Sequence, residues 1–362
     1  MTGSEPSRPT WAARTEALLQ RHWWRAQPSL LMRLLWPLSQ VYGGLARLAK
    51  WRAQPQTGPA VPVLVVGNLV AGGAGKTPVV IALVQAFQAA GRMPGVVTRG
   101  HGRRGDGTRA VAASDLAADV GDEPLLIRRR SGVPVWVGRD RSAAARALCA
   151  AHPEVDVLLS DDGLQHHRLR RDAELLVFDD RGIGNGMLLP AGPLREPLPA
   201  GPLREPLPAQ AGPRQRVLYT GGHVSTALAG ACGQRRLPLA WPLADWLRSE
   251  PGSAVVLRSL RDRPLLAAAG LAAPQKFFDM LTAAGLAFTA LPLPDHHPYA
   301  TLPWPAGTPD VLTTEKDAVK LDPAALLGTR VWVLPLDFQL PPGLAAELLT
   351  LLPAPQRNTP LP

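Results

Sequence analysis

Apolar residues recur along the chain in short runs that alternate with segments of helical spacing. Residues 61–66 have the composition of a buried parallel strand, and residues 79–90 repeat apolar side chains at helical intervals. Further strand-like runs occur at 95–97, 155–159, 174–178, 216–219, 264–269, 310–313 and 331–334. Helical spacing occurs again at 274–286. Strands that alternate with helices predict an α/β fold, with a parallel sheet flanked by helices.

A tandem duplication interrupts this pattern. Residues 191–199, Ala-Gly-Pro-Leu-Arg-Glu-Pro-Leu-Pro, recur unchanged at 200–208. Because proline lacks the backbone donor that a helix interior or a central strand requires, we interpret 191–213 as a linker. The expected division is an N-terminal segment at 1–53, a first α/β domain at 54–190, a second, smaller α/β domain at 214–345 and a C-terminal tail at 346–362.

The composition is that of a globular protein. With 362 residues and 46% hydrophobic content, the chain can bury one large or two ordinary domains, which argues against a disordered protein. Its two cysteines, Cys149 and Cys232, are far apart and neither lies in a CxxC pair, so neither a disulfide framework nor a zinc site is indicated. A reducing compartment fits best.

The N-terminal 53 residues concentrate charge and tryptophan. They hold eight Lys or Arg against two Glu, which supplies +6 of the formal net charge of +10, and five of the ten tryptophans. Basic residues and tryptophans that alternate with leucines are typical of a helix lying in an anionic bilayer interface. Arg33, Pro37 and Arg47 interrupt the apolar run, which favours a monotopic anchor over a spanning helix of about 20 apolar residues. A helix packed on its own protein is the alternative.

The remainder of the chain carries a net charge of only +4 and shows no nucleic-acid recognition motif. We therefore expect no nucleic-acid partner. No small-residue cleavage site follows the N-terminal apolar run, which argues against a secretory signal.

A glycine-rich segment joins the first predicted strand to the first predicted helix. Glycines at such a turn let backbone N–H groups close on phosphate oxygens, while Lys76 can reach the β- and γ-phosphates and Thr77 can ligate Mg²⁺. The strict Walker pattern requires glycine where Val70 stands, and a turn without ligand is the alternative. The whole segment is Val70, Ala71, Gly72, Gly73, Ala74, Gly75, Lys76 and Thr77.

Acidic residues stand at two further positions where chemistry is possible. Asp161 and Asp162 follow the strand at 155–159, and carboxylates at the carboxyl end of a parallel strand can reach a phosphate-bound Mg²⁺. A turn is the alternative there. Asp122 and Glu123 precede a proline at the expected start of a helix, where a helix cap is an equally good explanation.

Two loops also concentrate polar groups. Residues 295–299 read Asp-His-His-Pro-Tyr, a density of titratable groups that favours a site over a set of surface residues. Residues 313–317, Thr-Thr-Glu-Lys-Asp, end another strand and allow the same two interpretations.

Taken together, these motifs resemble the tetraacyldisaccharide 4′-kinase family. One such motif would be weak evidence, whereas seven in order are specific. They extend over most of the chain, from about residue 30 to residue 340, and comprise 67–78, 98–100, 121–124, 161–166, 190–196, 295–296 and 313–320.

The resemblance implies a P-loop NTPase-like kinase of lipid A biosynthesis at the cytoplasmic face of the bacterial inner membrane. Such an enzyme transfers the γ-phosphate of ATP, with Mg²⁺, to the 4′-hydroxyl of a tetraacylated glucosamine disaccharide 1-phosphate. The lipid A disaccharide precursor and the inner-membrane surface are then the expected partners. A lipid substrate also accounts for the basic, tryptophan-rich N-terminal segment.

The resemblance further implies roles for single residues. Asp122 matches the catalytic base of the family and His296 the imidazole that pairs with it, and a carboxylate polarised by histidine can accept the proton of an attacking hydroxyl. The expected phosphate-neutralising residues are Arg141 and Arg195. The expected metal-site residues are Thr77, Asp161, Asp162 and Glu196.

The chain departs from the family pattern at Val70, at His101, where an aromatic residue is commoner, and at the duplication. The duplication leaves two candidate pairs, Arg195-Glu196 and Arg204-Glu205, for one position in the site. The segment leading into the first copy matches the family pattern, which favours Arg195 and Glu196.

Two other classes of function stay open from the residues alone. A P-loop GTPase or ATPase acting as a switch or metal-insertion factor would carry an Asn/Thr-Lys-x-Asp motif, and residues 314–317 have Glu where Asn or Thr should stand. A membrane-surface interaction protein without catalysis is the second class. Retention of Lys76, Thr77, Asp122 and His296 argues against it.

Overall fold

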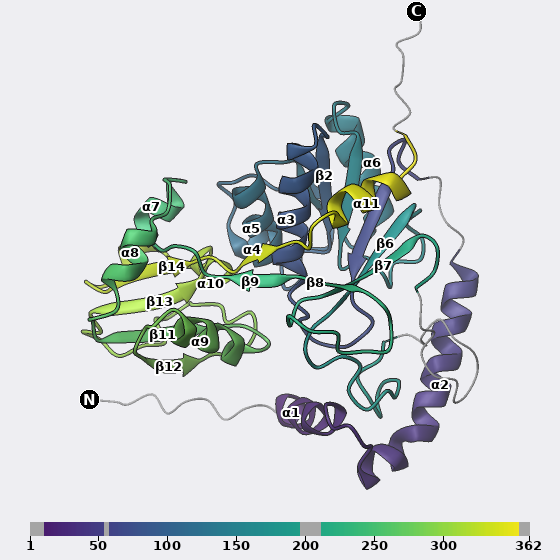
Figure 1. The fold of residues 1–362 in the computed structure, drawn as a ribbon, viewed down its shortest axis with the longest axis horizontal. Coiled ribbons are helices and arrows are strands. Elements are labelled where there is room, and N and C mark those ends of the chain that lie inside the picture. The colour runs from purple at the N-terminus through teal and green to yellow at the C-terminus, as the bar shows by residue number, and fades with distance from the viewer. Residues whose placement is uncertain (1–10, 54–57, 196–210, 355–362) are drawn as a thin grey trace, which may run out of the picture.

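The computed structural model describes residues 11–53, 58–195 and 211–354, which form two α/β units with two N-terminal helices beside the first (Figure 1). Each unit is built on its own sheet, and a two-stranded ribbon lies between them. The architecture confirms the predicted α/β class.

The first unit contains an eight-stranded sheet in the order β3-β4-β2-β5-β1-β6-β7-β8. Neighbouring strands are parallel except β3 and β4. β1 lies inside the sheet, and all five of its residues are buried, as its continuous apolar run predicts. The strands are β1 (Val63–Gly67), β2 (Pro94–Thr98), β3 (Arg109–Ala110), β4 (Val135–Val137), β5 (Val157–Asp161), β6 (Ala173–Phe178), β7 (Gln215–Tyr219) and β8 (Ala231–Cys232).

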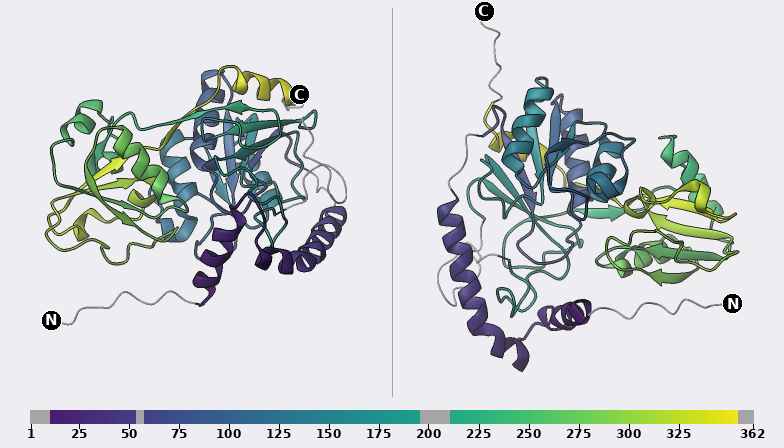
Figure 2. Two further views of the ribbon diagram at one scale, coloured as in Figure 1. Left: turned by 60° about the horizontal axis from the view of Figure 1, so that its bottom comes forward. Right: turned by 180° about the vertical axis from the view of Figure 1, so that it is seen from behind.

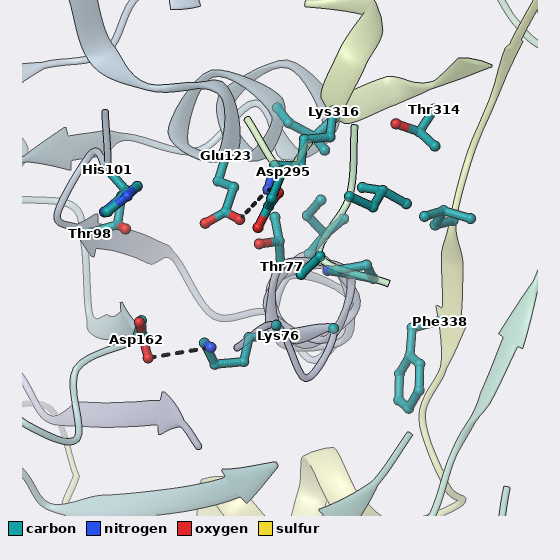
Figure 3. Close-up of a pocket in the computed structure, with 18 of the residues that line it drawn as sticks. Lys76, Thr77, Thr98, His101, Glu123, Asp162, Asp295, Thr314, Lys316 and Phe338 are labelled. Carbon is teal, nitrogen blue, oxygen red and sulfur yellow. Dashed lines mark hydrogen bonds and ion pairs between the residues drawn. The ribbon is translucent and has the colours of Figure 1, made fainter. Parts of the chain in front are cut away.

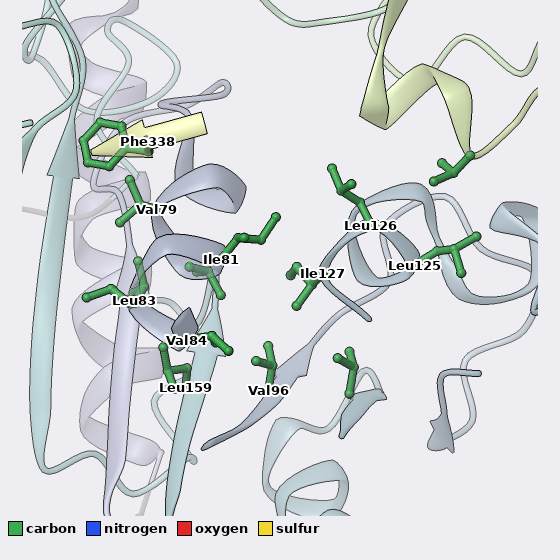
Figure 4. Packing of buried hydrophobic residues seen from close by; sticks show 14 of the residues in the cluster. Val79, Ile81, Leu83, Val84, Val96, Leu125, Leu126, Ile127, Leu159 and Phe338 are labelled. Carbon is green, nitrogen blue, oxygen red and sulfur yellow. The ribbon is translucent and has the colours of Figure 1, made fainter. Parts of the chain in front are cut away.

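Helices pack against this sheet and complete its core. α3 (Lys76–Ala89) contacts β1, β2 and β5 on one side and α5 and α11 elsewhere, so it is apolar around most of its circumference. Figure 4 shows Leu83 and Val84 of α3 beside Val96 and Leu159 of the sheet. The other helices of this unit are α4 (Ala117–Val120), α5 (Asp122–Ser131), α6 (Arg141–Ala151) and α11 (Leu344–Leu351).

The second unit contains a five-stranded sheet in the order β10-β14-β13-β11-β12, parallel except where β10 meets β14. Its strands are β10 (Trp241–Pro242), β11 (Leu265–Ala269), β12 (Phe288–Pro292), β13 (Asp310–Thr314) and β14 (Arg330–Leu334). Its helices are α7 (Leu243–Leu247), α8 (Ala254–Ser259), α9 (Pro274–Ala283), α10 (Glu315–Ala318) and the 3₁₀ turn η1 (Pro323–Ala325).

The chain crosses between the units twice, and the two crossings pair with each other. β9 (Gln234–Arg236) leads into the second unit, and β15 (Asp337–Gln339) leads back; they form an antiparallel ribbon. Gly233 is required beside this ribbon because a Cβ there would lie 2.2 Å from Cζ of Phe338. The ribbon therefore holds both crossings in one close-packed strand pair.

Sheet membership does not follow the predicted domain boundaries. β7 and β8 follow the predicted linker but extend the first sheet, where β7 covers the edge that β6 would otherwise expose. The predicted tail at 346–362 begins inside α11, which packs back on α3. The second unit is thus shorter than 214–345, because the first sheet recruits segments from both of its ends.

The N-terminal segment forms α1 (Trp11–Trp23) and α2 (Leu30–Arg52), and α2 lies along the side of the first unit that faces away from the second (Figure 2). Among the described residues, no helix has the length and apolar character needed to cross a bilayer. One side of α2 nevertheless exposes large apolar side chains at intervals of three and four residues: Leu31, Leu34, Leu38, Val41, Leu45 and Leu48.

Candidate active site

The glycine-rich segment forms the predicted strand-turn-helix between β1 and α3. Gly72 and Gly75 have φ values of +93° and +75°, a left-handed backbone that glycine adopts without strain, and Gly75 is the N-cap of α3. The Lys76 ammonium donates to Asn68 Oδ1 at 3.1 Å and lies 3.4 Å from Asp162 Oδ1. The helix N-terminus and Lys76 therefore face the same space (Figure 3).

Val70, the departure from the Walker pattern, has a packing role. Its side chain is fully buried, and its backbone forms an antiparallel bridge with Leu194. An apolar residue at this position anchors the start of the loop to the segment that carries Arg195.

Asp161 and Asp162 lie at the carboxyl end of β5, beside Lys76. Asp161 is buried, and its Oδ1 atom has no hydrogen-bond partner within the described residues. Burial, reinforced by the nearby charge of Glu123, raises the pKa of Asp161. For Asp162, burial also acts to raise the pKa, but Lys76 and Arg195 outweigh it and hold the pKa below its usual value. The pair thus offers one ionised carboxylate and one that a cation would ionise.

Asp122 and His296, which are 174 residues apart, form a hydrogen-bonded pair between the two units. Asp122 begins α5 and is 5% exposed. His296 Nδ1 lies 2.9 Å and 3.2 Å from the two carboxylate oxygens of Asp122. Burial alone would raise the pKa of Asp122, but the hydrogen bond to His296 and the charges of Lys316 and Lys320 lower it to about 2. The same hydrogen bond raises the pKa of His296.

Two lysines from the 313–320 motif surround this pair. Lys316 Nζ lies 3.0 Å from Glu123 Oε1 and 3.0 Å from Asp295 Oδ1. Lys320 Nζ lies 3.6 Å from Asp122 Oδ2. Both cations come from the second unit, whereas Asp122 and Glu123 belong to the first. The cations therefore bring the two halves of the site together and keep Asp122 ionised.

The two arginines expected at the phosphates converge on Asp162. Arg195 Nη1 lies 3.6 Å from Asp162 Oδ2, and Arg141 Nη2 donates to the Asp162 carbonyl at 3.4 Å. Arg141 is 6% exposed, its Nε has no partner within the described residues, and burial lowers its pKa. Glu196, Arg204 and Glu205 lie outside the described residues.

Many of these groups line one cavity of about 990 Å³ between the two units, and Asp122 reaches it through its hydrogen bond to His296. The first unit contributes the phosphate loop, Arg141, Asp162 and Arg195, and the second contributes His296 and Lys316. Within the described residues, no cluster of three or more His, Cys, Asp or Glu converges as a metal site by itself.

The cavity also contains a cation that no sequence pattern singled out. Arg235 of β9 is half-buried, its Nη2 donates to Thr220 Oγ1 at 3.0 Å, and the same atom would lie 2.7 Å from a Cβ added at Gly75. Arg235 follows the duplication and has no motif around it, so only the fold brings it to the phosphate loop.

The half-matching nucleotide-specificity motif at 314–317 has a structural role. Asp317, its acidic member, is fully buried and accepts hydrogen bonds from Gly270 N at 2.8 Å, from Thr314 Oγ1 at 2.9 Å and from Lys320 Nζ at 2.9 Å. A carboxylate so occupied is not available to read a guanine base.

Comparison with known proteins agrees with this geometry. A family model described as Tetraacyldisaccharide-1-P 4′-kinase matches residues 31–198 and 197–353. The tetraacyldisaccharide 4′-kinase of Leptothrix cholodnii is 52% identical over 355 residues, covering 95% of this chain and 98% of the relative. That of Methylibium petroleiphilum is 50% identical over 357 residues, covering 96% and 97%.

A solved structure is also similar. It is the crystal structure of the "apo" form of LpxK from Aquifex aeolicus in complex with ATP. The TM-score is 0.67 at 25% sequence identity, and the alignment covers 89% of this chain and 98% of that chain.

Proposed function

The chain belongs to the tetraacyldisaccharide 4′-kinase family, the ATP-dependent kinases of a step in lipid A biosynthesis, and from that premise we propose how its residues perform phosphoryl transfer. The observation that carries the proposal is the meeting of a phosphate loop and a buried Asp-His pair at one cavity. A kinase needs both elements: one holds the triphosphate and the other takes a proton from the acceptor hydroxyl.

ATP binds through its phosphates at residues 70–77. The N–H groups of this loop and the Lys76 ammonium neutralise the β- and γ-phosphates, and Arg141 and Arg195 complete the positive surround. The unpaired Nε of buried Arg141 supports this role, because a buried donor without a partner is costly unless a ligand satisfies it.

Mg²⁺ fits the donors present beside the loop. Thr77, Asp161 and Asp162 would hold it with phosphate oxygens, and the unpartnered Asp161 Oδ1 is the observation that supports this assignment. The ion, when bound, neutralises charge that develops on the phosphates. Glu196, the fourth expected member, lies outside the described residues.

His296 takes the proton of the sugar 4′-hydroxyl. Asp122 orients the imidazole through its hydrogen bond and raises the pKa of the imidazole. A carboxylate whose pKa is lowered to about 2 is a weak base, whereas the pKa of His296 is raised from 6.5 toward the operating range of a base. The proposal thus assigns the base to His296, whereas the family resemblance implies Asp122. His296 Nδ1 is bound to Asp122, so Nε2 is the atom that receives the proton.

The acceptor is the 4′-hydroxyl of the tetraacylated glucosamine disaccharide 1-phosphate, at the cytoplasmic face of the bacterial inner membrane. The exposed apolar side of α2 supports this location, since leucines beside basic residues suit a bilayer interface.

Phosphorylation of the disaccharide precursor by purified variants tests the proposal. We expect Lys76→Ala to lower kcat on the order of 10²-fold or more while the thermal unfolding midpoint stays unchanged. We also expect the Asp122→Ala/His296→Ala double variant to be little worse than either single variant, because residues that act as a unit are not additive. Near-normal turnover of Lys76→Ala would refute the phosphate-loop assignment, and multiplicative losses would separate the pair.

A further inference from the structure

One side of α2 packs on a segment of the first unit, residues 188–195, and is distinct from the exposed leucine side. Ser39 and Gly43 of α2 are buried, and a Cβ at Gly43 would lie 2.8 Å from Cδ1 of Leu188. Ser39 Oγ donates to the Leu188 carbonyl at 2.9 Å and accepts from Ala191 N at 3.1 Å. The helix is therefore attached to this segment by close packing and by specific hydrogen bonds.

The opposite side of residues 188–195 is attached to the start of the phosphate loop. Arg195 N donates to the Leu69 carbonyl at 2.8 Å, and Ala71 N donates to the Pro193 carbonyl at 2.6 Å. Together with the bridge between Val70 and Leu194, these bonds place the segment between α2 and the phosphate loop.

Arg195 is held at its backbone from both sides. Its N–H is bound to Leu69 on the phosphate-loop side, and its carbonyl accepts from the Tyr42 hydroxyl of α2 at 2.8 Å. Its side chain extends to Asp162 of the site. A long, flexible arginine reaches a phosphate reproducibly only if its Cα is fixed, and Tyr42 supplies one of the two bonds that fix it.

We propose that Tyr42 is a positioning residue for the nucleotide site, so that the helix facing the membrane also sets the reach of Arg195 toward the ATP phosphates. The proposal rests on the phosphate-binding role of Arg195 given above. It separates two functions on one helix: the leucine side binds the bilayer, and the Tyr42 side supports the site.

The test uses the full chain and two readouts, the Kd of a fluorescent ATP analogue and co-sedimentation with anionic phospholipid vesicles. A hydrogen bond of about 0.5–1.5 kcal/mol corresponds to roughly two- to tenfold in affinity, so Tyr42→Phe should raise the Kd by that factor and leave vesicle binding unchanged. Leu45→Ser, the matched variant on the exposed side, should weaken vesicle binding and leave the Kd unchanged.

A double-variant cycle distinguishes positioning from general destabilisation. If Tyr42 acts through Arg195, Tyr42→Phe should add little to the Kd of Arg195→Ala. Multiplicative effects, an unchanged Kd in Tyr42→Phe, or an unchanged Kd in Arg195→Ala would each overturn the proposal. An unchanged Kd in Lys76→Ala would instead refute the proposed function, so the two failures are distinguishable.

Discussion

At the scale of single residues, the proposed mechanism depends on the pKa values of Asp122 and His296, which are shifted in opposite directions. The hydrogen bond between them lowers the pKa of Asp122 to about 2 and raises that of His296 above its ordinary 6.5. Asp122 therefore stays ionised throughout the physiological range, and His296 determines the pH at which the base becomes available.

The pH dependence of kcat tests this assignment. His296 must be neutral to accept a proton, so kcat should fall as the pH drops through the raised pKa of His296, with a midpoint above 6.5. Asp122→Asn removes the carboxylate that raises the pKa of His296, so the acid limb of the kcat profile should move to lower pH. The same variant should lower kcat by about 10²–10⁴-fold. An acid limb that stays in place in Asp122→Asn would show that His296 is not the titrating base.

At the scale of elements, α2 combines an exposed apolar side with a buried polar attachment, so the membrane role proposed for it can be tested without deleting the helix. High salt screens charge but not apolar insertion, so 1 M salt, with a Debye length of about 3 Å, should release only part of the protein from membranes. In the Leu34→Ser/Leu45→Ser double variant, salt should release all of the protein from membranes. Each leucine that inserts into the bilayer contributes about 1.5–3 kcal/mol to membrane binding, and both contributions are lost.

The control for this prediction is Val255→Ser. Val255 is 64% exposed but lies on α8 of the second unit, so its loss should leave membrane retention unchanged. Complete release of the unaltered protein by salt would mean that the attachment is purely electrostatic.

At the scale of the whole molecule, an ion pair between Arg130 and the buried Glu315 joins the two units in the wall of the cavity. Arg130 of α5 lies 2.8 Å from Glu315 Oε2 and 2.6 Å from Asp337 Oδ1, and Trp246 Nε1 donates to Glu315 at 2.9 Å. Glu315 is only 4% exposed. The ion pair between Arg130 and Glu315 therefore links the relative position of the two units to the free energy of unfolding of the protein.

Arg130→Met should lower the free energy of unfolding by about 3–5 kcal/mol, because it leaves the Glu315 charge buried and unpaired. Adding Glu315→Gln should recover part of this loss. Arg248→Met, which breaks the exposed pair with Asp245, should cost less than about 1 kcal/mol. Urea unfolding measures all three, and equal losses in Arg130→Met and Arg248→Met would contradict a coupling role for the buried pair.

The sequence alone predicted what depends on neighbouring residues. The run at 61–66, the glycines that follow and the helical spacing after Thr77 specify strand, turn and helix locally, because backbone conformation and amphipathic period are short-range properties. The same reasoning placed Asp161 and Asp162 at the end of a strand. The pairing of Asp122 with His296 came instead from resemblance to a family, since no spacing rule relates positions so far apart.

Only the tertiary structure decided which distant segments meet. β7 joins the first sheet rather than the second because an open strand edge and an apolar surface must be covered, and local pattern does not say by which strand. Arg235 reaches the phosphate loop, Lys320 approaches Asp122, and Tyr42 binds the Arg195 carbonyl through the same long-range packing. Local motifs thus supply the reactive groups, whereas the pKa values of these groups and the attachment of the site to α2 depend on contacts that exist only in the folded chain.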